Sequence, residues 1–458
     1  MVRTLLAVSI TIVLLSVCAF AQERDLFSVV DERGVSLDQN QARVIAKIRQ
    51  EQTTLSVQLV RFDALANLKN APSLRVSLPT VGSISASQRR AETVRANEWV
   101  WSGSFAGEKG SVFLSATGIH ITGVIQFERH LFWINPLGGG LHALIRVDQS
   151  KIPPDEPPDW NPTPQQEEKN GQSEGAQSIP YGIESTTTTP VIDVMVAYTP
   201  AAAASSGNIS SLVEACIQST NDVHINSDAN VRVTRIHAVQ VSYVESGSLQ
   251  TDVNRLRGTN DGYMDNIHSL RNQYGADIVV LLVDYGDYAG IAYWIEVGAS
   301  DAFAVVVDNY AVGNYTFAHE IGHLVGARHD NDPNALPRRY AHGYRYAPGY
   351  WRTVMAVSDP NVFRINYWSN PRKTYGGVAM GTVDWNDNTR VWNERASTVA
   401  EFRSSTPPSP LPNPPYITLD ASGLHPRLNW NSVTDATSYN IYYGSIQGAP
   451  GTVSCNMV

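Results

Sequence analysis

Cysteine is scarce in this chain, with three residues of this type among 458. Exported proteins that depend on a disulfide framework use many more, so a disulfide scaffold is excluded. Cys18 lies in an N-terminal apolar run, and Cys216 lies in a stripe of apolar residues at helical spacing. The position of Cys216 predicts a buried core thiol rather than a metal ligand or a nucleophile. A bridge between Cys216 and Cys455 stays open, although nothing in the sequence supports it.

Positive charge is also limited. The chain has 34 Lys and Arg against 43 Asp and Glu, a net charge of −9, and the basic residues form no visible cluster. Nucleic-acid binding needs such clusters, so we expect no nucleic-acid partner. The hydrophobic share of 43% and the charged share of 17% are typical of globular proteins, and the length predicts two to four folded units.

Long hydrophobic runs are confined to the N-terminus. Arg3 precedes the apolar run Leu5–Val17, which is too short to span a bilayer comfortably, and Ala19-Phe20-Ala21 supplies a small-x-small cleavage site. The first 21 residues are therefore interpreted as a signal peptide. A lipoprotein anchor at Cys18 is the alternative, but Val17 is bulky where such sites have a small residue. We expect export to the outside of the cell or the periplasm, without a stable membrane anchor.

Residues 22–189 divide into two parts of different composition. Residues 22–150 contain short β-prone runs separated by glycine-containing turns, which predicts a mainly β domain. Residues 151–189 are rich in Pro, Ser and Thr and predict an exposed linker, the kind of segment where proteases cut. The β-prone runs begin at Trp99, Ser111, Gly118, Leu131 and Ala143.

Residues 190–405 alternate between α and β patterns, which predicts a mostly parallel sheet with helices packed on it, an α/β (α+β) fold. Strands are expected at 191–198, 231–244, 277–283, 290–294 and 303–307, and helices around Leu212 and at 264–274, 317–325 and 389–403. Residues 406–415 form a second, Pro-rich linker. In residues 416–458, Trp430 and the later Tyr439-Asn440-Ile441-Tyr442 resemble the start of a fibronectin type III module, of which only a partial β-sandwich fits.

The candidate metal-binding and catalytic residues lie in one motif, His319–Asp330. His319 and His323 are four residues apart, so a helix presents both imidazoles on one face, with Glu320 beside them. Gly326 can adopt a positive φ and end the helix, which lets the chain double back and brings His329 to the same point. Neutral imidazole nitrogens suit Zn²⁺, so this spacing predicts a three-histidine zinc site.

Three protein ligands leave a fourth position for water. The metal lowers the pKa of that water, and Glu320 can take its proton and later deliver it to a leaving amine. The adjacent Asp330 is interpreted as structural support for the turn. This chemistry is peptide hydrolysis.

The extended motif is far more specific than its first five residues. A bare HExxH occurs by chance in many helices, whereas the added Gly326 and His329 bring the chance below about one in ten thousand at ordinary residue frequencies. Met355 follows shortly after the third histidine, at the place of a Met-turn beneath a zinc ion.

These residues resemble a known family. Residues from about 190 to 404 resemble metzincins, and His319–Asp330 looks most like the reprolysin (adamalysin) branch, in which Asp follows the third histidine. Arg364–Pro371 and Asn388–Val391 are similar to bacterial enzymes of the peptidyl-Asp metalloendopeptidase group. The fold implied is the metzincin catalytic domain.

The resemblance implies a zinc metalloendopeptidase that acts on proteins or peptides. It implies one catalytic Zn²⁺ bound by His319, His323 and His329, with Glu320 as the catalytic base and Met355 as the Met-turn residue. By the same resemblance, residues 22–150 are a propeptide domain, the linker at 151–189 contains the processing site, and the enzyme is made as a zymogen.

The sequence departs from some relatives of this type. Astacins and serralysins have a zinc-ligating Tyr two residues after the Met, and this chain has Val357 there. Matrix metalloproteinases are kept latent by a prodomain cysteine, whereas residues 22–215 contain none. Any latency must therefore come from another ligand or from occlusion. The sequence leaves calcium binding open.

Two features predict contacts with the substrate: the family resemblance and the positive charge of three residues. The resemblance implies that an edge strand formed by Gly290, Ile291, Ala292 and Tyr293 pairs with extended substrate. Arg364, together with Arg372 and Lys373, lies in the segment expected near the primed-side pocket. A basic pocket would favour cleavage before Asp or Glu, and the alternative is that these are solvated surface cations.

The motif argues against two other functions. An aminopeptidase with HExxH and a distant Glu ligand would not need His329 at this spacing. A catalytically inactive secreted binding or adhesion protein on a metzincin scaffold would not need Glu320, which is present.

Overall fold

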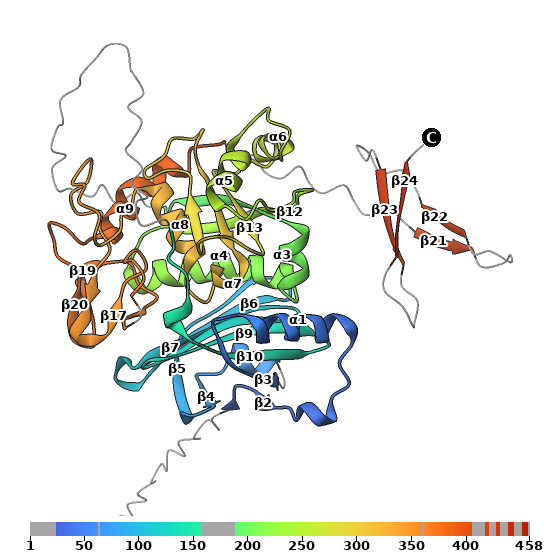
Figure 1. Cartoon of the computed structure of the whole chain (residues 1–458), viewed down its shortest axis with the longest axis horizontal. Helices are drawn as coiled ribbons and strands as arrows, with labels where there is room; N and C mark the ends of the chain where they lie inside the picture. The colour runs from blue at the N-terminus through green and yellow to red at the C-terminus, as the bar shows by residue number, and fades with distance from the viewer. Residues whose placement is uncertain are drawn as a thin grey trace, which may run out of the picture. The chain divides into compact units, whose positions relative to one another are not determined.

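The computed structural model describes residues 24–62, 65–156, 188–359 and 361–404, together with four short strands near the C-terminus. The chain divides into two compact units, Met1–Lys151 and Ile152–Val458 (Figure 1). The expected signal peptide lies outside the described residues. Within the described part of the chain, no helix is both long and apolar enough to cross a membrane.

The N-terminal unit is built on one ten-stranded sheet, in the order β1-β4-β5-β6-β7-β8-β9-β10-β3-β2. Its pairs are antiparallel apart from β1 with β4. The β-prone runs of the sequence fall within β6 to β10. The strands are β1 (Arg24–Asp25), β2 (Ser28–Val29), β3 (Thr54–Arg61), β4 (Ser73–Leu78), β5 (Gly82–Arg95), β6 (Glu98–Phe105), β7 (Gly110–Thr117), β8 (His120–Phe127), β9 (His130–Gly138) and β10 (Leu141–Val147).

Two helices accompany this sheet, α1 (Gln39–Gln50) and α2 (Leu65–Lys69). α1 starts at a capping box, in which the Asp38 side chain accepts a hydrogen bond from the Gln41 main-chain N–H and the Gln41 side chain accepts one from Asp38. The apolar face of α1 buries Val44, Ile45 and Ile48.

The second unit contains a five-stranded sheet in the order β12-β11-β13-β15-β14. β12, β11, β13 and β15 are parallel to their neighbours, and β14 is an antiparallel edge strand. The mostly parallel sheet predicted from the sequence is thus present, with one antiparallel edge. The strands are β11 (Val191–Tyr198), β12 (Arg232–Gln240), β13 (Ile278–Val283), β14 (Gly290–Ala292) and β15 (Phe303–Val307).

Helices cover both faces of this sheet, which explains why every residue of β13 and β15 is buried. One set of alternate strand residues packs with α5 and α6 around Leu249, Val253 and Ile267. The other face receives α4 and α8, and α9 packs against α8 and β11. The helices are α3 (Pro200–Ser205), α4 (Ile209–Ser227), α5 (Leu249–Arg257), α6 (Asn266–Tyr274), α7 (Asp308–Ala311), α8 (Thr316–Val325) and α9 (Asn388–Val399).

α4 carries Cys216, which is fully buried and free. Burial raises the pKa of its thiol well above the usual value. The buried core thiol predicted from the apolar stripe is confirmed.

Smaller elements follow α8: the strands β16 (Arg345–Tyr346), β17 (Trp351–Arg352) and β18 (Phe363–Arg364) form one small sheet, and β19 (Asn370–Tyr375) and β20 (Val378–Met380) form a hairpin. Near the C-terminus, β21 (Ile417–Asp420) pairs with β22 (Arg427–Trp430), and β23 (Ser438–Tyr443) pairs with β24 (Gly451–Asn456). The Pro-rich linker expected at 406–415, and the remaining residues of the partial fibronectin type III-like module expected at 416–458, lie outside the described residues.

The start of the segment at 151–189 differs from the exposed linker that its composition predicts. Asp155 and Glu156 are 3% and 4% exposed. Both belong to the second unit, because the division between the units falls after Lys151. Tertiary contacts therefore bury these two acidic side chains despite their polar, Pro-rich surroundings. The residues at 157–187 lie outside the described part.

Candidate active site

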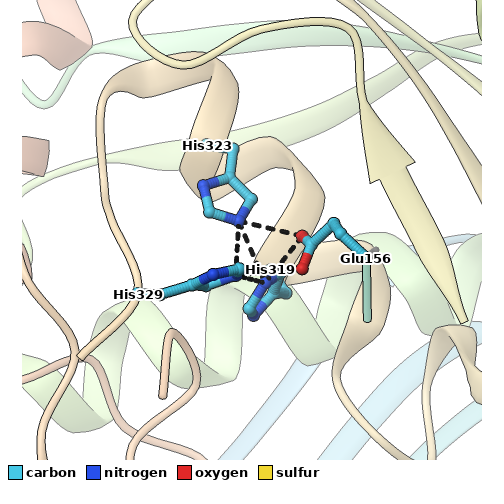
Figure 2. A group of neighbouring side chains, drawn as sticks. All are labelled: Glu156, His319, His323 and His329. Carbon is cyan, nitrogen blue, oxygen red and sulfur yellow. Dashed lines mark hydrogen bonds and ion pairs between the residues drawn. The ribbon is translucent and has the colours of Figure 1, made fainter. Parts of the chain in front are cut away.

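Three histidines converge at one end of α8 (Figure 2). His319 and His323 lie one helical turn apart and are fully buried. Gly326 ends the helix with φ +126, and the chain then turns back to bring in His329. The three Nε2 atoms lie 3.0 to 3.1 Å from one another. The convergence predicted from the spacing of the motif is what the structure shows.

Main-chain carbonyls fix the orientation of two of these rings. Nδ1 of His319 donates a hydrogen bond to the Val354 carbonyl oxygen at 2.8 Å, and Nδ1 of His323 donates one to the Ala327 carbonyl oxygen at 2.9 Å. A carbonyl oxygen only accepts, so the proton of each neutral ring lies on Nδ1. The Nε2 lone pairs therefore point at a common centre, which is the arrangement of a cation site.

A fourth group completes this centre. The carboxylate of Glu156 lies 3.0 Å from Nε2 of His319 and 2.9 Å from Nε2 of both His323 and His329. Its side chain points at the three rings in Figure 2. These four groups form a possible metal-ligand set. A tetrahedral zinc ion with metal–nitrogen bonds of about 2.0 Å needs ligand atoms about 3.3 Å apart, close to the separations seen, so the donor set fits Zn²⁺.

The charges at the centre are strongly coupled. Burial by itself would raise the pKa of Glu156, but the facing His329, His319 and His323 hold that pKa well below its usual value. Burial lowers the pKa of His323 to about 4, which favours the neutral ring that a metal requires.

Glu320 lies beside this centre and is fully buried. Burial, followed by the neighbouring Glu156 and Asp155 carboxylates, raises the pKa of Glu320 well above its usual value. Among the described residues, no N–H group or cation donates a hydrogen bond to either of its oxygens. Gly290 of β14 makes room for it, because a Cβ atom there would lie 2.6 Å from Oε1 of Glu320.

Of the four residues predicted to form a substrate-binding edge strand, three form β14 and Tyr293 lies outside it. The Gly290 main-chain N–H donates a hydrogen bond to the Asp155 carbonyl oxygen at 3.0 Å, so it faces the neighbourhood of the centre. Ile291 and Ala292 are buried in β14 and pair with β15. Tyr293 lies beyond the end of β14, and its ring is covered by the Arg257 guanidinium, 4.9 Å from the ring centroid.

Arg364 lies next to the centre and binds Asp155. Its Nη1 donates a hydrogen bond to Oδ1 of Asp155 at 3.0 Å, and its Nη2 binds the other carboxylate oxygen. Asn314 Nδ2 and Thr316 Oγ1 donate to the same Oδ1, at 3.2 and 3.4 Å. The Asn314 carbonyl oxygen in turn accepts from Nη1 of Arg364 at 2.7 Å, which holds the guanidinium in place. The result is a buried cluster of polar side chains around one carboxylate.

The other two cations expected near this pocket lie elsewhere. Arg372 forms a two-pronged pair with Asp387, at 2.5 and 2.8 Å. Lys373 pairs with the exposed Asp228 at 2.9 Å. The structure therefore favours the alternative interpretation for Arg372 and Lys373, in which they are surface cations and do not line a substrate pocket.

Comparisons with known proteins agree with this site. A family model for metallopeptidase family M12 (Reprolysin_5) matches residues 188–369. A peptidyl-Asp metalloendopeptidase of Stenotrophomonas maltophilia (strain R551-3) is 37% identical over 412 residues, covering 85% of this chain and 96% of the relative. One of Xanthomonas campestris pv. campestris is 34% identical over 375 residues, covering 78% and 88%.

The chain belongs to metallopeptidase family M12. It is a zinc metalloendopeptidase, as the motif and the resemblance predict. The resemblance to metzincins and the Zn²⁺ cofactor are confirmed, and its substrates are proteins or peptides.

Met355 and Asp330 contact segments that carry the three histidines of this metalloendopeptidase. Met355 is fully buried, and a Cβ atom on Gly322 of α8 would lie 2.8 Å from its Sδ atom. Oδ1 of Asp330 accepts a hydrogen bond from the Val357 main-chain N–H at 2.9 Å, and its other oxygen pairs with Arg345. Asp330 therefore joins the segment after the third histidine to the segment after Met355.

Sequence reasoning did not find the remaining members of the site. Asp155 and Glu156 lie in a Pro-rich segment whose composition indicates a linker, and no spacing connects them to the zinc motif. Asn314 and Thr316 lie just before the motif and on its helix, where polar residues near a helix start are common. Only their tertiary contacts reveal them.

Proposed function

We propose that this metalloendopeptidase is exported, is made as a zymogen, and cuts proteins before acidic residues with Glu320 as the general base. The observation that supports the acidic preference best is the Arg364–Asp155 pair, which lies beside the zinc site. It puts a carboxylate-binding pocket next to the place where a peptide bond would be cut.

The catalytic step uses the chain's own groups around the metal. A bound zinc ion supplies Lewis acidity, which activates water and polarises the peptide carbonyl. His319 and His323 are held by main-chain carbonyls, so that their Nε2 atoms face the point where the metal would bind. Glu320 would accept a proton from the attacking water and deliver it to the leaving amine. Gly290 leaves the space beside Glu320 that these proton transfers need.

The buried charge of Arg364 would distinguish acidic substrate side chains from uncharged ones. Arg364 is 5% exposed, and among the described residues Asp155 is its carboxylate partner. A substrate side chain without a negative charge would leave this cation buried and unpaired, which costs several kcal/mol. An acidic side chain just after the cut bond replaces Asp155 and restores the pair. The relatives named peptidyl-Asp metalloendopeptidase support the same preference.

A peptide library with all residues at the position after the cut tests this preference. We expect the processed enzyme to cut before Asp and Glu, and Arg364→Met to lose that preference by about 100-fold or more in kcat/KM, in line with the cost of an unpaired buried charge. Lys373→Met is the matched control, since this cation pairs with Asp228 on the surface. No acidic enrichment in the products would exclude the proposed specificity.

The zymogen is supported by the order of the parts along the chain. A folded β unit precedes the second unit, and Glu156, near the start of the second unit, contacts the histidines proposed to bind zinc. N-terminal sequencing of the active enzyme after export should give a start between residues 157 and 187. Full activity of the intact chain starting near Gln22 would contradict the zymogen.

A further inference from the structure

We propose that Arg352 of β17 is a second specificity-determining residue, a buried cation that acts with Arg364 to select substrates with an acidic side chain after the cut bond. This rests on the proposed function, in which the polar cluster around Arg364 receives that side chain. With two cations beside one substrate carboxylate, the enzyme discriminates against uncharged side chains more strongly than Arg364 alone allows.

The small sheet of β16, β17 and β18 has one aromatic face and one arginine face. Arg345, Arg352 and Arg364 are paired across its three strands. Paired residues of neighbouring strands project from the same face of a sheet, and the next residue of each strand projects from the other face. The adjacent residues in this sheet are all aromatic: Tyr346, Trp351 and Phe363. They belong to one apolar cluster, so the three cations gather on the opposite side.

Arg352 and Arg364 meet at one main-chain atom. Nη1 of Arg352 and Nη2 of Arg364 both donate hydrogen bonds to the carbonyl oxygen of Ala356, the second at 3.3 Å. The same Nη2 atom of Arg364 binds the Asp155 carboxylate. The two guanidinium groups therefore lie side by side, and Arg352 is the neighbour of the group that binds the carboxylate.

Arg352 differs from the other two arginines of this face in its partners. Arg364 pairs with Asp155, and Arg345 pairs with two carboxylates, at 3.1 and 2.9 Å. Among the described residues, no carboxylate forms an ion pair with Arg352, and its Nε atom has no hydrogen-bond partner. Arg352 is nevertheless 4% exposed. It is thus a buried cation that the described fold leaves without a paired negative charge.

The surroundings of Arg352 show what such a cation responds to. Burial, followed by the positive charge of Arg364, holds the pKa of Arg352 well below its usual value, and the Asp155 carboxylate acts in the opposite direction. Arginine keeps its charge in proteins, so the energetic cost of burying it stays in the fold. A negative group bound at Arg364 reduces that cost.

This relation makes Arg352 part of the selection of substrates. In a buried site, a charge acts on its neighbours over several ångströms and is screened weakly by salt. A substrate Asp in place of Asp155 is attracted by both cations. A substrate Asn of nearly the same shape leaves Arg352 and Arg364 facing each other without a counter-charge, which is a repulsive element against the wrong substrate.

The test compares two peptides that differ only in Asp or Asn after the cut bond. The mature enzyme is prepared by expressing the full chain with Arg352→Gln, which removes the charge and keeps an N–H donor for the Ala356 carbonyl oxygen. We expect the ratio of kcat/KM for the Asp peptide to that for the Asn peptide to fall about 10-fold. The loss should come from slower cleavage of the Asp peptide, with the Asn peptide cut as well as before or better.

Arg352→Lys and Arg372→Gln separate the charge from a structural role. Arg352→Lys keeps a cation at this position, and its Asp-to-Asn ratio should stay within about 3-fold of the parent. Arg372→Gln is the matched control, because that arginine pairs with Asp387 at the surface, and its ratio should equal that of the parent. A residue that only holds the Ala356 carbonyl in place would affect both peptides alike.

Zinc content and thermal unfolding establish that each variant is folded and loaded. An Arg352→Gln enzyme that keeps the ratio of the parent, or that loses equal activity on both peptides, would overturn the proposal. If this variant does not fold, Arg352→Lys decides the question: a retained ratio supports the role of the charge, and a ratio lost despite the retained cation excludes it.

The proposed function and the role of Arg352 fail in different measurements. A parent enzyme that cuts the Asp and Asn peptides equally well would exclude the proposed specificity itself. A parent that prefers the Asp peptide, loses this preference with Arg364→Met and keeps it with Arg352→Gln would retain the function and exclude the second cation.

Discussion

His319 and Val354 are joined by a hydrogen bond of 2.8 Å from the ring Nδ1 to the main-chain carbonyl oxygen. Val354 directly precedes Met355, so this segment orients the His319 ring through its backbone and also packs against Gly322 of α8. Gly322 lies against Met355 at the same level of the helix. The metal site therefore depends on a tight fit between one helix and one turn.

Gly322→Ala should disturb this fit. Its Cβ would lie 2.8 Å from Sδ of Met355 and 3.3 Å from the Trp368 ring. Overpacking of this kind costs about 1–3 kcal/mol of unfolding free energy, and we expect a lower Tm and weaker zinc binding. Thermal unfolding and zinc titration measure both. Gly298→Ala is the control, since nothing lies within 4 Å of its added Cβ, and an equal loss there would contradict the explanation.

Gly290→Ala should impair catalysis while zinc stays bound. The added Cβ would lie 2.6 Å from Oε1 of Glu320 and 2.7 Å from Cγ2 of Thr316, so Glu320 must move. A displacement near 1 Å in a catalytic group costs about 100-fold in rate. Steady-state kinetics and metal analysis of the processed enzyme check this. An unchanged kcat would show that the space beside Glu320 is not needed.

Glu320→Ala should retain zinc and lose proteolysis. The histidines keep their main-chain hydrogen bonds in this variant, whereas the proton acceptor is gone. General-base catalysis is worth about 100- to 10,000-fold, and we expect a loss of kcat in that range. Zinc content is the internal control. Proteolysis that survives the substitution would exclude the mechanism and the general base together.

The stability of the catalytic unit should fall in acid through His224. This ring is fully buried, and burial lowers its pKa to about 3, while its Nδ1 accepts a hydrogen bond of 3.0 Å from Nε1 of Trp368. The unfolded chain has a histidine pKa of about 6.5 and takes up the proton first. The contribution of neutral His224 is therefore complete above about pH 6.5 and is lost as the pH falls towards 3, at up to about 1.4 kcal/mol per pH unit.

His224→Gln keeps an acceptor for Trp368 and removes this titration. Urea unfolding followed by tryptophan fluorescence between pH 4 and 7 should show a pH slope smaller by nearly one proton than in the parent. His130→Gln, in the N-terminal unit, is the control variant. The same slope in parent and His224→Gln would contradict the role of this ring.

The part of the site that the sequence predicts lies within one short segment, His319–His329. Helical periodicity places His319 and His323 together, and the positive φ available to Gly326 returns His329 to them. These relations need no knowledge of the rest of the fold. The alternation of strands and helices likewise predicted the mostly parallel sheet, since both faces of a parallel sheet are covered and its strands are continuously apolar.

What could not be predicted depends on contacts distant in sequence. Glu156 and Asp155 reach the site across more than 150 residues, and a Pro-rich polar segment has no periodicity that would indicate burial. The sequence predicts Arg364 near the substrate pocket, but charge alone does not distinguish it from Arg372 and Lys373 in the same segment. Their partners are Asp387, which caps the start of α9, and Asp228, which follows the end of α4, and only the folded chain brings them near.

The free thiol of Cys216 has a consequence for where this enzyme can fold. It is buried on α4 and is the cysteine of the described catalytic fold, so that fold is assembled without any oxidation step. Disulfide isomerases and the redox poise of the compartment are then irrelevant to its maturation. Reductants that inactivate disulfide-dependent proteases should leave this one working.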